Sequence, residues 1–426
     1  MNTFRAATIA AVRITPIALK DPPLLNASGV HQPFALRSII EIDSDDGAVG
    51  LGETYGDDPI LWRLQAVAPH LAGASPLDLH AVEAIVRTRA FTADEQRAMA
   101  QSPGSPAARA FTKVFGAFEA ALADLCARRE GVPLAVWLGG PVRDRVPYSA
   151  YLFYKFAQHI GQPYDADRWG AALDAEGIVR QAGQMVGEFG FRSIKLKAGV
   201  FEPELEADAL IALRAAFPHH PLRIDPNGNW SLATAQGIAQ RLGSELEYYE
   251  DPVPTLADMA ALRSLSGLEL ATNMVVCDVA ELRENVRLGA VQTILLDHHA
   301  WGGFRATREL AAMCRAFGLR LSMHSNSHAG ISLMAMTHLA ASLPDLDYAC
   351  DTHYPWQSED LLQGGPVRFH DGAVMLPLSP GLGVDIDQGL LGALHEQYLR
   401  CGIRWRDDAS EMRKYEPGFI KRKPRY

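Results

Sequence analysis

Two lysines lie two positions apart in the stretch SIKLKAG, residues 193–199. The stretch is otherwise apolar and β-prone, and alternate residues of a strand point to one face, so Lys195 and Lys197 would lie side by side. A neighbouring positive charge disfavours the charged form of a lysine side chain. The pair therefore predicts that Lys197 can act as a base near neutral pH.

Polar residues also end five later apolar runs of the sequence. They are Asp225 in LRIDPNG, Glu250 in YYEDPV, Asn273 in LELATNM, Asp297 in QTILLDHH and His324 in LRLSMHSN, and successive members are 23 to 27 residues apart. Asp351 and His353 close one more run, LDYACDTH. This spacing is typical of β/α units, whose strands present their carboxyl ends at one rim of a barrel. We therefore expect these side chains to meet in one place.

Three of these residues have the character of metal ligands. Asp225, Glu250 and Asn273 offer only oxygen donors, from two carboxylates and one amide. Such donors suit Mg²⁺, with water or substrate oxygens completing six positions, and the lack of a thiol or imidazole disfavours Zn²⁺. The sequence therefore predicts a magnesium site, and a bound cation would offset part of the net charge of −10.

His324 and Asp297 form a second candidate pair, on the other side of the predicted barrel. A carboxylate beside a histidine can hold the ring in one tautomer. A cation that binds a carboxylate stabilises the enediolate that forms when a proton leaves the adjacent carbon. With an amine and an imidazole flanking that cation, the predicted chemistry is proton abstraction α to a carboxylate.

Each of these residues taken alone also fits a structural role. Asp225 in DPNG suits an Asx turn, paired lysines can blunt a sheet edge, and a lone histidine such as His324 is most often a satisfied core residue. The catalytic interpretation is favoured because all of these residues fall at the ends of the predicted strands, at the same position in successive β/α units. Unrelated structural residues would not keep that phase.

The elements that would position these residues change in character near residue 145. Before it, RSIIEI and AVGLGE flank the turn DSDDG and predict a β-hairpin, AAVRITPIAL predicts a strand, LLNASGVHQPF predicts a loop, and residues 106–129 predict a long helix. After it, eight apolar runs, from YSAYLFY to LDYACDT, alternate with helical segments. The pattern predicts an α/β fold, in which an α+β region precedes a parallel β/α barrel.

Composition narrows the class of protein further. The chain has 426 residues and a net charge of −10, which argues against a nucleic-acid-binding surface. No apolar run approaches the roughly 20 residues that span a bilayer, so we expect no membrane partner. Five scattered cysteines without CxxC spacing indicate a reducing compartment, and they predict a cytoplasmic protein.

The sequence resembles the enolase superfamily and, within it, the glucarate dehydratase group. The motifs that carry the resemblance are KLKAG, DPNGNW, YEDPV, ATNM, MHSNSH and DTHYPWQ, with RDDA near the end of the chain. The resemblance implies a modified TIM barrel of the (β/α)7β type over residues 141–385 and an α+β capping domain over residues 1–140. It also implies that residues 386–426 return to the capping domain.

The resemblance further implies an activity and roles for individual residues. The expected reaction is Mg²⁺-dependent elimination of water from a hexarate, D-glucarate or a close relative, giving a keto-deoxy sugar diacid. Lys197 and His324 would be the bases, with Asp297 beside the histidine and Lys195 beside the lysine, and Asp225, Glu250 and Asn273 would hold the cation. Substrate contacts are implied for Asn26, His31, Tyr151, Lys195, Asn227, Asn273, Ser325, Asn326, His353 and Arg406. We also expect a homo-oligomer.

Two other functions stay open on the sequence. Two bases on opposite faces of one carbon are enough to invert it, so an acid sugar racemase or epimerase of the same superfamily is the alternative enzyme. A barrel that binds an acid sugar without reacting would be expected to have lost a base or a metal ligand. None of Lys197, His324, Asp225, Glu250 and Asn273 is missing, which argues against that second possibility.

Overall fold

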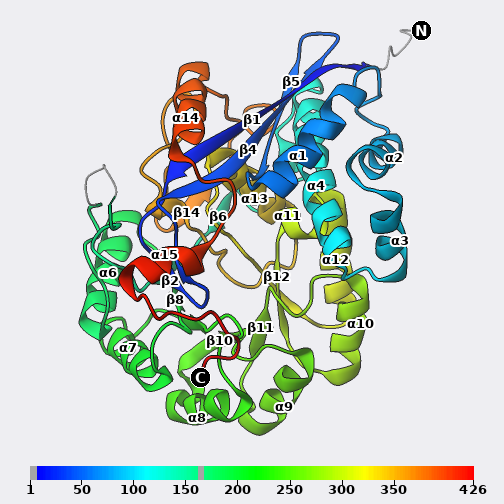
Figure 1. Cartoon of the computed structure of the whole chain (residues 1–426). Coiled ribbons are helices and arrows are strands. Elements are labelled where there is room, and N and C mark those ends of the chain that lie inside the picture. Colours follow the sequence, from blue (N-terminus) through cyan, green and yellow to red (C-terminus); the bar gives the residue numbers. More distant parts are fainter. Residues whose placement is uncertain (1–6, 162–166) are drawn as a thin grey trace.

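An antiparallel sheet and a group of helices from the first part of the chain form a cap (Figure 1). The structure, a computed structural model, describes residues 7–161 and 167–426. The sheet has the strand order β1–β4–β5, with β1 at Ile9–Lys20, β4 at Phe34–Ser44 and β5 at Val49–Tyr55. The helices are α1 (Asp58–Val67), η1 (Ala68–His70), α2 (Leu79–Ala90), α3 (Ala93–Gln101) and α4 (Pro106–Arg129).

The local predictions for the cap are largely confirmed. The predicted hairpin is the antiparallel pair β4–β5, and the predicted long helix is α4. Ser105 caps α4 by accepting a hydrogen bond from the Ala108 amide. The helix lies directly on β5, where a Cβ atom at Gly52 would come within 2.8 Å of the Ala117 carbonyl oxygen. The glycine therefore permits the close approach of helix and strand.

The stretch LLNASGVHQPF, predicted as a loop, contains a small hairpin. Its strands are β2 (Leu25–Asn26) and β3 (Gly29–Val30), which pair antiparallel. Gly29 has φ of +138°, and a Cβ atom there would collide with the carbonyl of Asp408. The hairpin is therefore pressed against α15 (Asp408–Tyr415), from the far end of the chain.

Seven parallel strands, in the order β7 to β13, form the barrel below the cap (Figure 1). They are β7 (Ala150–Phe153), β8 (Ile194–Lys197), β9 (Leu222–Asp225), β10 (Leu246–Glu250), β11 (Leu270–Thr272), β12 (Thr293–Leu296) and β13 (Arg320–Met323). The helices around them are α6 (Ala175–Phe189), α7 (Pro203–Ala216), α8 (Leu232–Leu242), η2 (Gly243–Glu245), α9 (Leu256–Ser266), α10 (Val279–Leu288), α11 (His298–Trp301), α12 (Phe304–Ala316) and α13 (Gly330–Ser342). The predicted fold, a capped parallel barrel, is confirmed.

The eighth predicted strand is not a regular strand. Its segment makes one parallel bridge, between Cys350 and Tyr148. The N–H of Asp351 donates to the carbonyl of Met323 in β13, and the N–H of Cys350 donates to that of Pro147, just before β7, each at 2.9 Å. Because the segment bonds to both neighbours, it closes the barrel although it forms no continuous ladder.

The remaining elements precede β7 or follow α13 in the chain. They are α5 (Leu134–Trp137), β6 (Arg145–Pro147), η3 (Tyr354–Trp356), β14 (Ala373–Met375), α14 (Gln388–Cys401) and α15. Helix α14 lies on β1, where Gln397 Nε2 donates to the Ala18 carbonyl at 2.8 Å. Residues 419–426 depart from the expected return to the cap, because they lie against the barrel loops at Asn227 and Asn229 instead.

The two largest apolar cores of the described residues hold the parts together. One fills the barrel and includes Ile194, Ile224 and Leu296, and the other lies inside the cap and includes Ile40 and Phe118. Helix α13 is buried along its whole length and is apolar on most of its surface. Among the helices of the described residues, none is both long enough and apolar enough to cross a membrane.

Glu53, at the end of the cap sheet, joins the cap to the barrel. Its carboxylate accepts hydrogen bonds from Arg37 Nε at 2.6 Å and from the backbone N–H groups of Ala329 and Ser332 at 2.8 and 2.7 Å. Those N–H groups lie at the start of α13, where the first amides of a helix have no partner within it. The side chains of Glu53 and Arg37 are 0 and 2% exposed.

Replacing Glu53 by alanine is expected to lower the free energy of unfolding by about 3–5 kcal/mol, because the Arg37 guanidinium would stay buried without its carboxylate. Urea denaturation followed by circular dichroism measures the loss. The control is Glu83→Ala, which removes a partly exposed ion pair with Arg87 and should cost no more than about 0.5 kcal/mol. Equal losses in the two variants would contradict the linking role of Glu53.

Candidate active site

The residues singled out in the sequence lie at the carboxyl ends of successive barrel strands. Each is either the last residue of its strand or the residue after it: Lys197 in β8, Asp225 in β9, Glu250 in β10, Asn273 after β11, Asp297 after β12 and His324 after β13. Because the strands are parallel neighbours, these ends share one rim, which the cap overlies (Figure 1). This rim is the candidate active site.

The three candidate metal ligands are connected by short polar contacts. Asn273 Nδ2 donates to Glu250 Oε1 at 3.0 Å, and the ammonium of Lys195 lies 2.6 Å from Glu250 Oε2 and 3.4 Å from Asp225 Oδ2. Both carboxylates are fully buried. No group of three or more His, Cys, Asp or Glu side chains in the described residues is arranged as a metal site, and the third candidate ligand here is an amide, that of Asn273.

The electrostatics of this group fit a divalent cation. Burial raises the pKa of Glu250 well above its usual value; Lys195 opposes that rise, and the carboxylates of Asp225 and Asp351 add to it. Burial also opposes ionisation of Asp225, but Lys197 and Lys195 lower its pKa to about 2. A cluster of buried carboxylates with only hard oxygen donors is therefore suited to Mg²⁺, which would relieve their mutual repulsion.

Lys195 and Lys197 lie side by side, as predicted, but in different surroundings. The ammonium of Lys195 touches Asp351 Oδ2 and Glu250 Oε2, both at 2.6 Å. Burial alone would lower the pKa of Lys195, but these carboxylates raise it well above its usual value. Lys197 donates to Asp225 Oδ2 at 2.6 Å and is 7% exposed at the mouth. Lys195 is thus held as a cation, and Lys197 is the lysine that faces the mouth.

His324 lies on the other side of the mouth. Lys197 ends β8, and His324 follows β13. Four strands, β9 to β12, lie between β8 and β13 in the sheet. His324 Nδ1 lies 3.1 Å from Asp297 Oδ2, which leaves Nε2 as the nitrogen available to a substrate. Although burial opposes it, the hydrogen bond with His324 and the neighbouring histidines hold the pKa of Asp297 well below its usual range. Asp297 also accepts the backbone N–H of His299 at 2.8 Å, which fixes its position.

Several predicted substrate contacts border the same mouth. The ring of His353 packs against Tyr151, with ring centroids 4.7 Å apart, and Tyr151 Oη donates to Asp225 Oδ2 at 3.5 Å. Asn227 donates its backbone N–H to Asp225 Oδ1 at 2.9 Å, and Ser325 Oγ accepts the N–H of His353 at 3.4 Å. Burial and the neighbouring His31 lower the pKa of His353 well below its usual value.

The predicted residues from the chain ends divide into two groups. His31 lies beside His353, with ring centroids 6.4 Å apart, and its Nδ1 is 3.0 Å from Asp21 Oδ2. Asn26 and Arg406 instead meet at Asp408: Asn26 Nδ2 donates at 2.8 Å and Arg406 Nε at 2.9 Å. These contacts place Arg406 beside a carboxylate of the protein itself. The structure therefore brings His31 to the mouth more directly than Asn26 or Arg406.

The cap contributes residues that the sequence did not reveal. Tyr55 and Lys113 line a cavity of about 290 Å³ together with Asn273, Asp297 and His324. The ammonium of Lys113 lies 4.4 Å from the centroid of the Tyr55 ring, and Tyr55 Oη accepts a hydrogen bond from Asn326 Nδ2 at 2.8 Å. No motif marks these two residues: Tyr55 ends the strand β5, and Lys113 lies in α4, which carries the pattern of an ordinary Ala-rich helix.

Two acidic residues of the barrel were also assigned no role from the sequence. Asp351, which ends the eighth run, is in contact with Lys195. Asp251 accepts the backbone N–H of Asn273 at 2.9 Å, and its other oxygen accepts the hydroxyl of Thr272 at 2.5 Å. Asp251 therefore positions Asn273. Its place beside Glu250 in the motif EDP was the one available indication.

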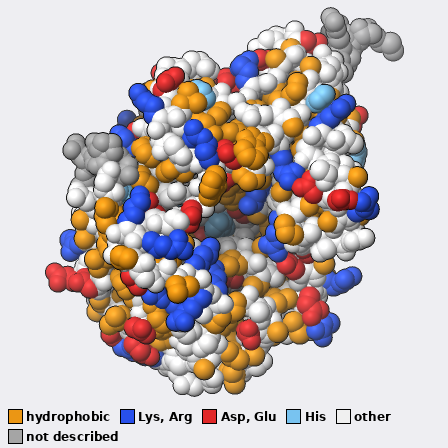
Figure 2. All heavy atoms as spheres, viewed as in Figure 1, with side chains coloured by type: hydrophobic (Ala, Val, Ile, Leu, Met, Phe, Trp, Pro, Cys, Tyr) orange, Lys and Arg blue, Asp and Glu red, His pale blue; other side chains and the backbone are white. Residues whose placement is uncertain are grey.

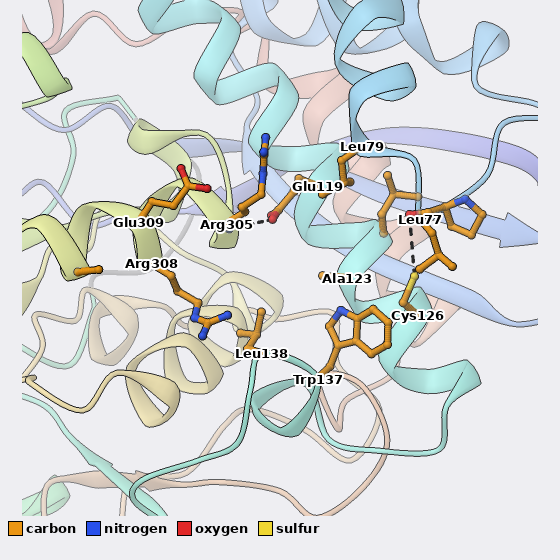
Figure 3. Close-up of a pocket in the computed structure, with 13 residues that line it drawn as sticks. Leu77, Leu79, Glu119, Ala123, Cys126, Trp137, Leu138, Arg305, Arg308 and Glu309 are labelled. Carbon is orange, nitrogen blue, oxygen red and sulfur yellow. Dashed lines mark hydrogen bonds between the residues drawn. The ribbon is translucent and has the colours of Figure 1, made fainter.

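A larger pocket, of about 490 Å³, is lined by none of the predicted site residues (Figure 3). It lies between α4, α5 and α12, and Figure 3 shows Trp137 and Arg308 at its border. Glu119 reaches into it but accepts the backbone N–H groups of Phe304 and Arg305 at 2.7 and 2.9 Å, which completes the start of α12. Its carboxylate is thus engaged in the fold, and the barrel mouth stays the candidate active site.

Comparisons with known proteins agree with this geometry. The family model described as Enolase C-terminal domain-like matches residues 177–390. Over 423 residues, which are 98% of this chain and 98% of the other, the sequence is 47% identical to that of a Streptomyces coelicolor protein named "Probable glucarate dehydratase".

Two similar crystal structures contain small ligands. An enolase from Pseudomonas fluorescens with bound magnesium, potassium and tartrate is 53% identical, with a TM-score of 0.95 over 99% of this chain and 100% of that chain. An enolase from Mycobacterium smegmatis complexed with tartrate is 50% identical, with a TM-score of 0.94 over 100% of both chains. Close structural relatives have thus been crystallised with magnesium and with a small hydroxylated dicarboxylate.

Proposed function

This chain belongs to the enolase superfamily, and we propose that it is a Mg²⁺-dependent dehydratase of a hexarate acid sugar, D-glucarate or a close relative. The chain is an enzyme homologous to a hydro-lyase of that superfamily. The observation that carries the proposal is the placement of Lys197 and His324 on opposite sides of the buried carboxylates Asp225 and Glu250. Tartrate in the relatives supports a substrate that carries two carboxylates and hydroxyl groups.

The residues would divide the reaction between them. Mg²⁺, when held by Asp225, Glu250 and Asn273, supplies positive charge that stabilises the enediolate. Lys197 or His324 would take the proton from the carbon next to the bound carboxylate, depending on the face at which that proton points. The hydroxyl on the following carbon then leaves as water, after receiving a proton from an acidic group at the mouth.

The contacts of the second substrate carboxylate are part of the proposal. His31 lies beside His353 at the mouth. Asn26 and Arg406 both donate hydrogen bonds to Asp408. Lys113 adds a cation on the wall of the cavity next to His324. A dicarboxylate could thus meet positive charge at both ends. The expected homo-oligomer and cytoplasmic location stay predictions.

The test is an assay of the purified protein with Mg²⁺ and a panel of hexarates, with the corresponding monocarboxylate sugar acids as controls. We expect a keto acid, detected with semicarbazide, from at least one hexarate and none from the monocarboxylates. A product of unchanged mass with one inverted carbon would favour the alternative, an epimerase, because two opposed bases also suffice for inversion. The absence of any exchange of the α proton in D₂O with Mg²⁺ would contradict both.

A further inference from the structure

The last residues of the chain, FIKRKPRY at 419–426, have no part in the proposed reaction. In the structure, this segment, called here the tail, leaves α15 and runs over the barrel loops that follow β8 and β9 (Figure 1). Phe419 is buried at its start, with 5% of its surface exposed. The tail is therefore anchored at one end and makes its further contacts close to the mouth.

Backbone hydrogen bonds hold the far end of the tail in place. The N–H groups of Arg425 and Tyr426 both donate to the carbonyl of Asn229, at 2.9 and 3.2 Å. Tyr426 Oη donates to the carbonyl of Val200 at 3.2 Å. The two acceptors belong to different loops, since Val200 follows β8 and Asn229 follows β9. The tail thus bridges the loop after the two lysines and the loop after Asp225.

Asn229 connects the same two loops beneath the tail. Its side chain is fully buried, its Nδ2 donates to the Gly199 carbonyl at 2.6 Å, and its Oδ1 accepts the N–H of Arg425 at 3.1 Å. Gly199 has φ of +75°, and a Cβ atom there would collide with the carbonyl of Pro226. The two loops are therefore closely packed against each other.

Lys423 makes the contact that leads to the predicted metal site. Its Nζ donates to the carbonyl of Asn227 at 2.6 Å, and the N–H of Asn227 donates to Asp225 Oδ1 at 2.9 Å. Asn227 has φ of +58°, a conformation that non-glycine residues rarely adopt and that its surroundings must maintain. One hydrogen bond from the tail thus restrains the residue that orients the Asp225 carboxylate.

The tail also carries several positive charges close to the mouth. Burial and the positive charge of Lys197 lower the pKa of Lys423, and the carboxylates of Asp225 and Asp251 oppose that shift. Lys421, Arg422, Lys423 and Arg425 make the tail strongly basic. Figure 2 shows Lys and Arg side chains gathered where Figure 1 draws the tail, beside a hollow in which histidine is visible.

We propose that Lys423 is a positioning residue for the magnesium site: by holding the Asn227 carbonyl, it keeps the Asp225 carboxylate aimed at the cation. This inference rests on the part of the proposed function that assigns Asp225 to Mg²⁺. It does not depend on which acid sugar reacts. The tail thereby couples the last residues of the chain to a ligand two hundred residues earlier.

The experiment compares three full-length variants with the wild type: Lys423→Met, Lys423→Arg and Lys421→Met. Lys421 is the matched control, because it carries the same charge on the same segment, and its side chain makes no hydrogen bond or ion pair with the described residues, 7–161 and 167–426. Isothermal titration with Mg²⁺ alone measures the dissociation constant. Thermal unfolding without Mg²⁺ shows whether each variant is folded.

We expect Lys423→Met to raise the Mg²⁺ dissociation constant about 10-fold, the lower end of the usual cost of losing a residue that orients a metal ligand. Lys423→Arg should restore wild-type binding to within about threefold, since it keeps the charge and the donor. Lys421→Met should leave the constant unchanged. In the assay, Lys423→Met should lose activity at limiting Mg²⁺ and recover it at saturating Mg²⁺, which a merely misfolded variant would not do.

Two outcomes would overturn the inference. One is wild-type Mg²⁺ affinity in a folded Lys423→Met variant, and the other is an equal loss in Lys421→Met, which would show an effect of net charge alone. The titration separates this inference from the choice of reaction. If the variants differ as expected but no hexarate reacts, the dehydratase proposal fails alone; if hexarates react and the variants bind Mg²⁺ equally, this inference fails alone.

Discussion

Replacing Lys197 by methionine is expected to lower kcat for one hexarate by about 10²–10⁴-fold, the usual contribution of a positioned base. Lys197 ends β8 and His324 follows β13, on opposite sides of the barrel, so as the proposed bases each would reach only one face of the reacting carbon. The loss should therefore depend on the substrate. Of two hexarates that differ only in configuration at the reacting carbon, the variant should retain α-proton exchange with one and lose it with the other.

The reciprocal variant, His324→Asn, is the matched control. It leaves Lys197 and its contact with Asp225 intact and should reverse the preference between the two hexarates. Proton exchange in D₂O followed by NMR measures both variants, because exchange reports proton abstraction even where no water is eliminated. If both variants lost exchange with both hexarates to the same extent, the two residues would not be independent bases.

Replacing Glu250 by glutamine is expected to remove the stabilisation of the protein by Mg²⁺. A cation present at 100 times its dissociation constant adds about 2.7 kcal/mol to the free energy of unfolding of a protein that binds it only when folded. Loss of a direct carboxylate ligand should weaken binding at least about 100-fold, since even residues that only orient ligands contribute 10- to 100-fold. At the same Mg²⁺ concentration, the free energy of unfolding of Glu250→Gln should rise by less than about 0.5 kcal/mol.

Glu247→Gln is the matched control for this measurement. Glu247 lies on the same strand, β10, but pairs with Arg223 at 2.6 Å and belongs to no predicted ligand set. Its variant should gain as much stability from Mg²⁺ as the wild type, whatever its own stability without the metal. Denaturation curves with Mg²⁺ and with EDTA give the free energy of unfolding with and without the metal. A full Mg²⁺ gain in Glu250→Gln would exclude this residue as a ligand, and with it the proposed site.

Much of the fold was accessible from the sequence because its indications are local. The hairpin β4–β5 follows from two apolar runs around an Asp-Gly turn, and α4 follows from the helical period of residues 106–129. The exception is the eighth run, LDYACDT, which has the composition of a strand. Its hydrogen bonds go to β13 on one side and to residues before β7 on the other, a pattern that no local rule predicts.

The candidate site was accessible for a related reason. In a parallel barrel, the last residue of every strand lies at one rim, so position along the chain translates directly into position in space. That rule is enough to bring Asp225, Glu250 and Asn273 together from three strands. It also suffices to place Lys197 and His324 apart, since they end strands on different sides of the barrel.

The sequence by itself therefore determined the residues that repeat in phase with the strands: the lysines, the candidate oxygen ligands and the histidine. Only the tertiary structure decided what surrounds them: Asp351 against Lys195, Lys113 and Tyr55 over the cavity, and Lys423 on the carbonyl of Asn227. The physical reason is that the periodic pattern of a helix or strand depends only on the residues of that element. Contacts between the cap, the tail and the barrel form only when distant segments pack, and they leave no period in the chain.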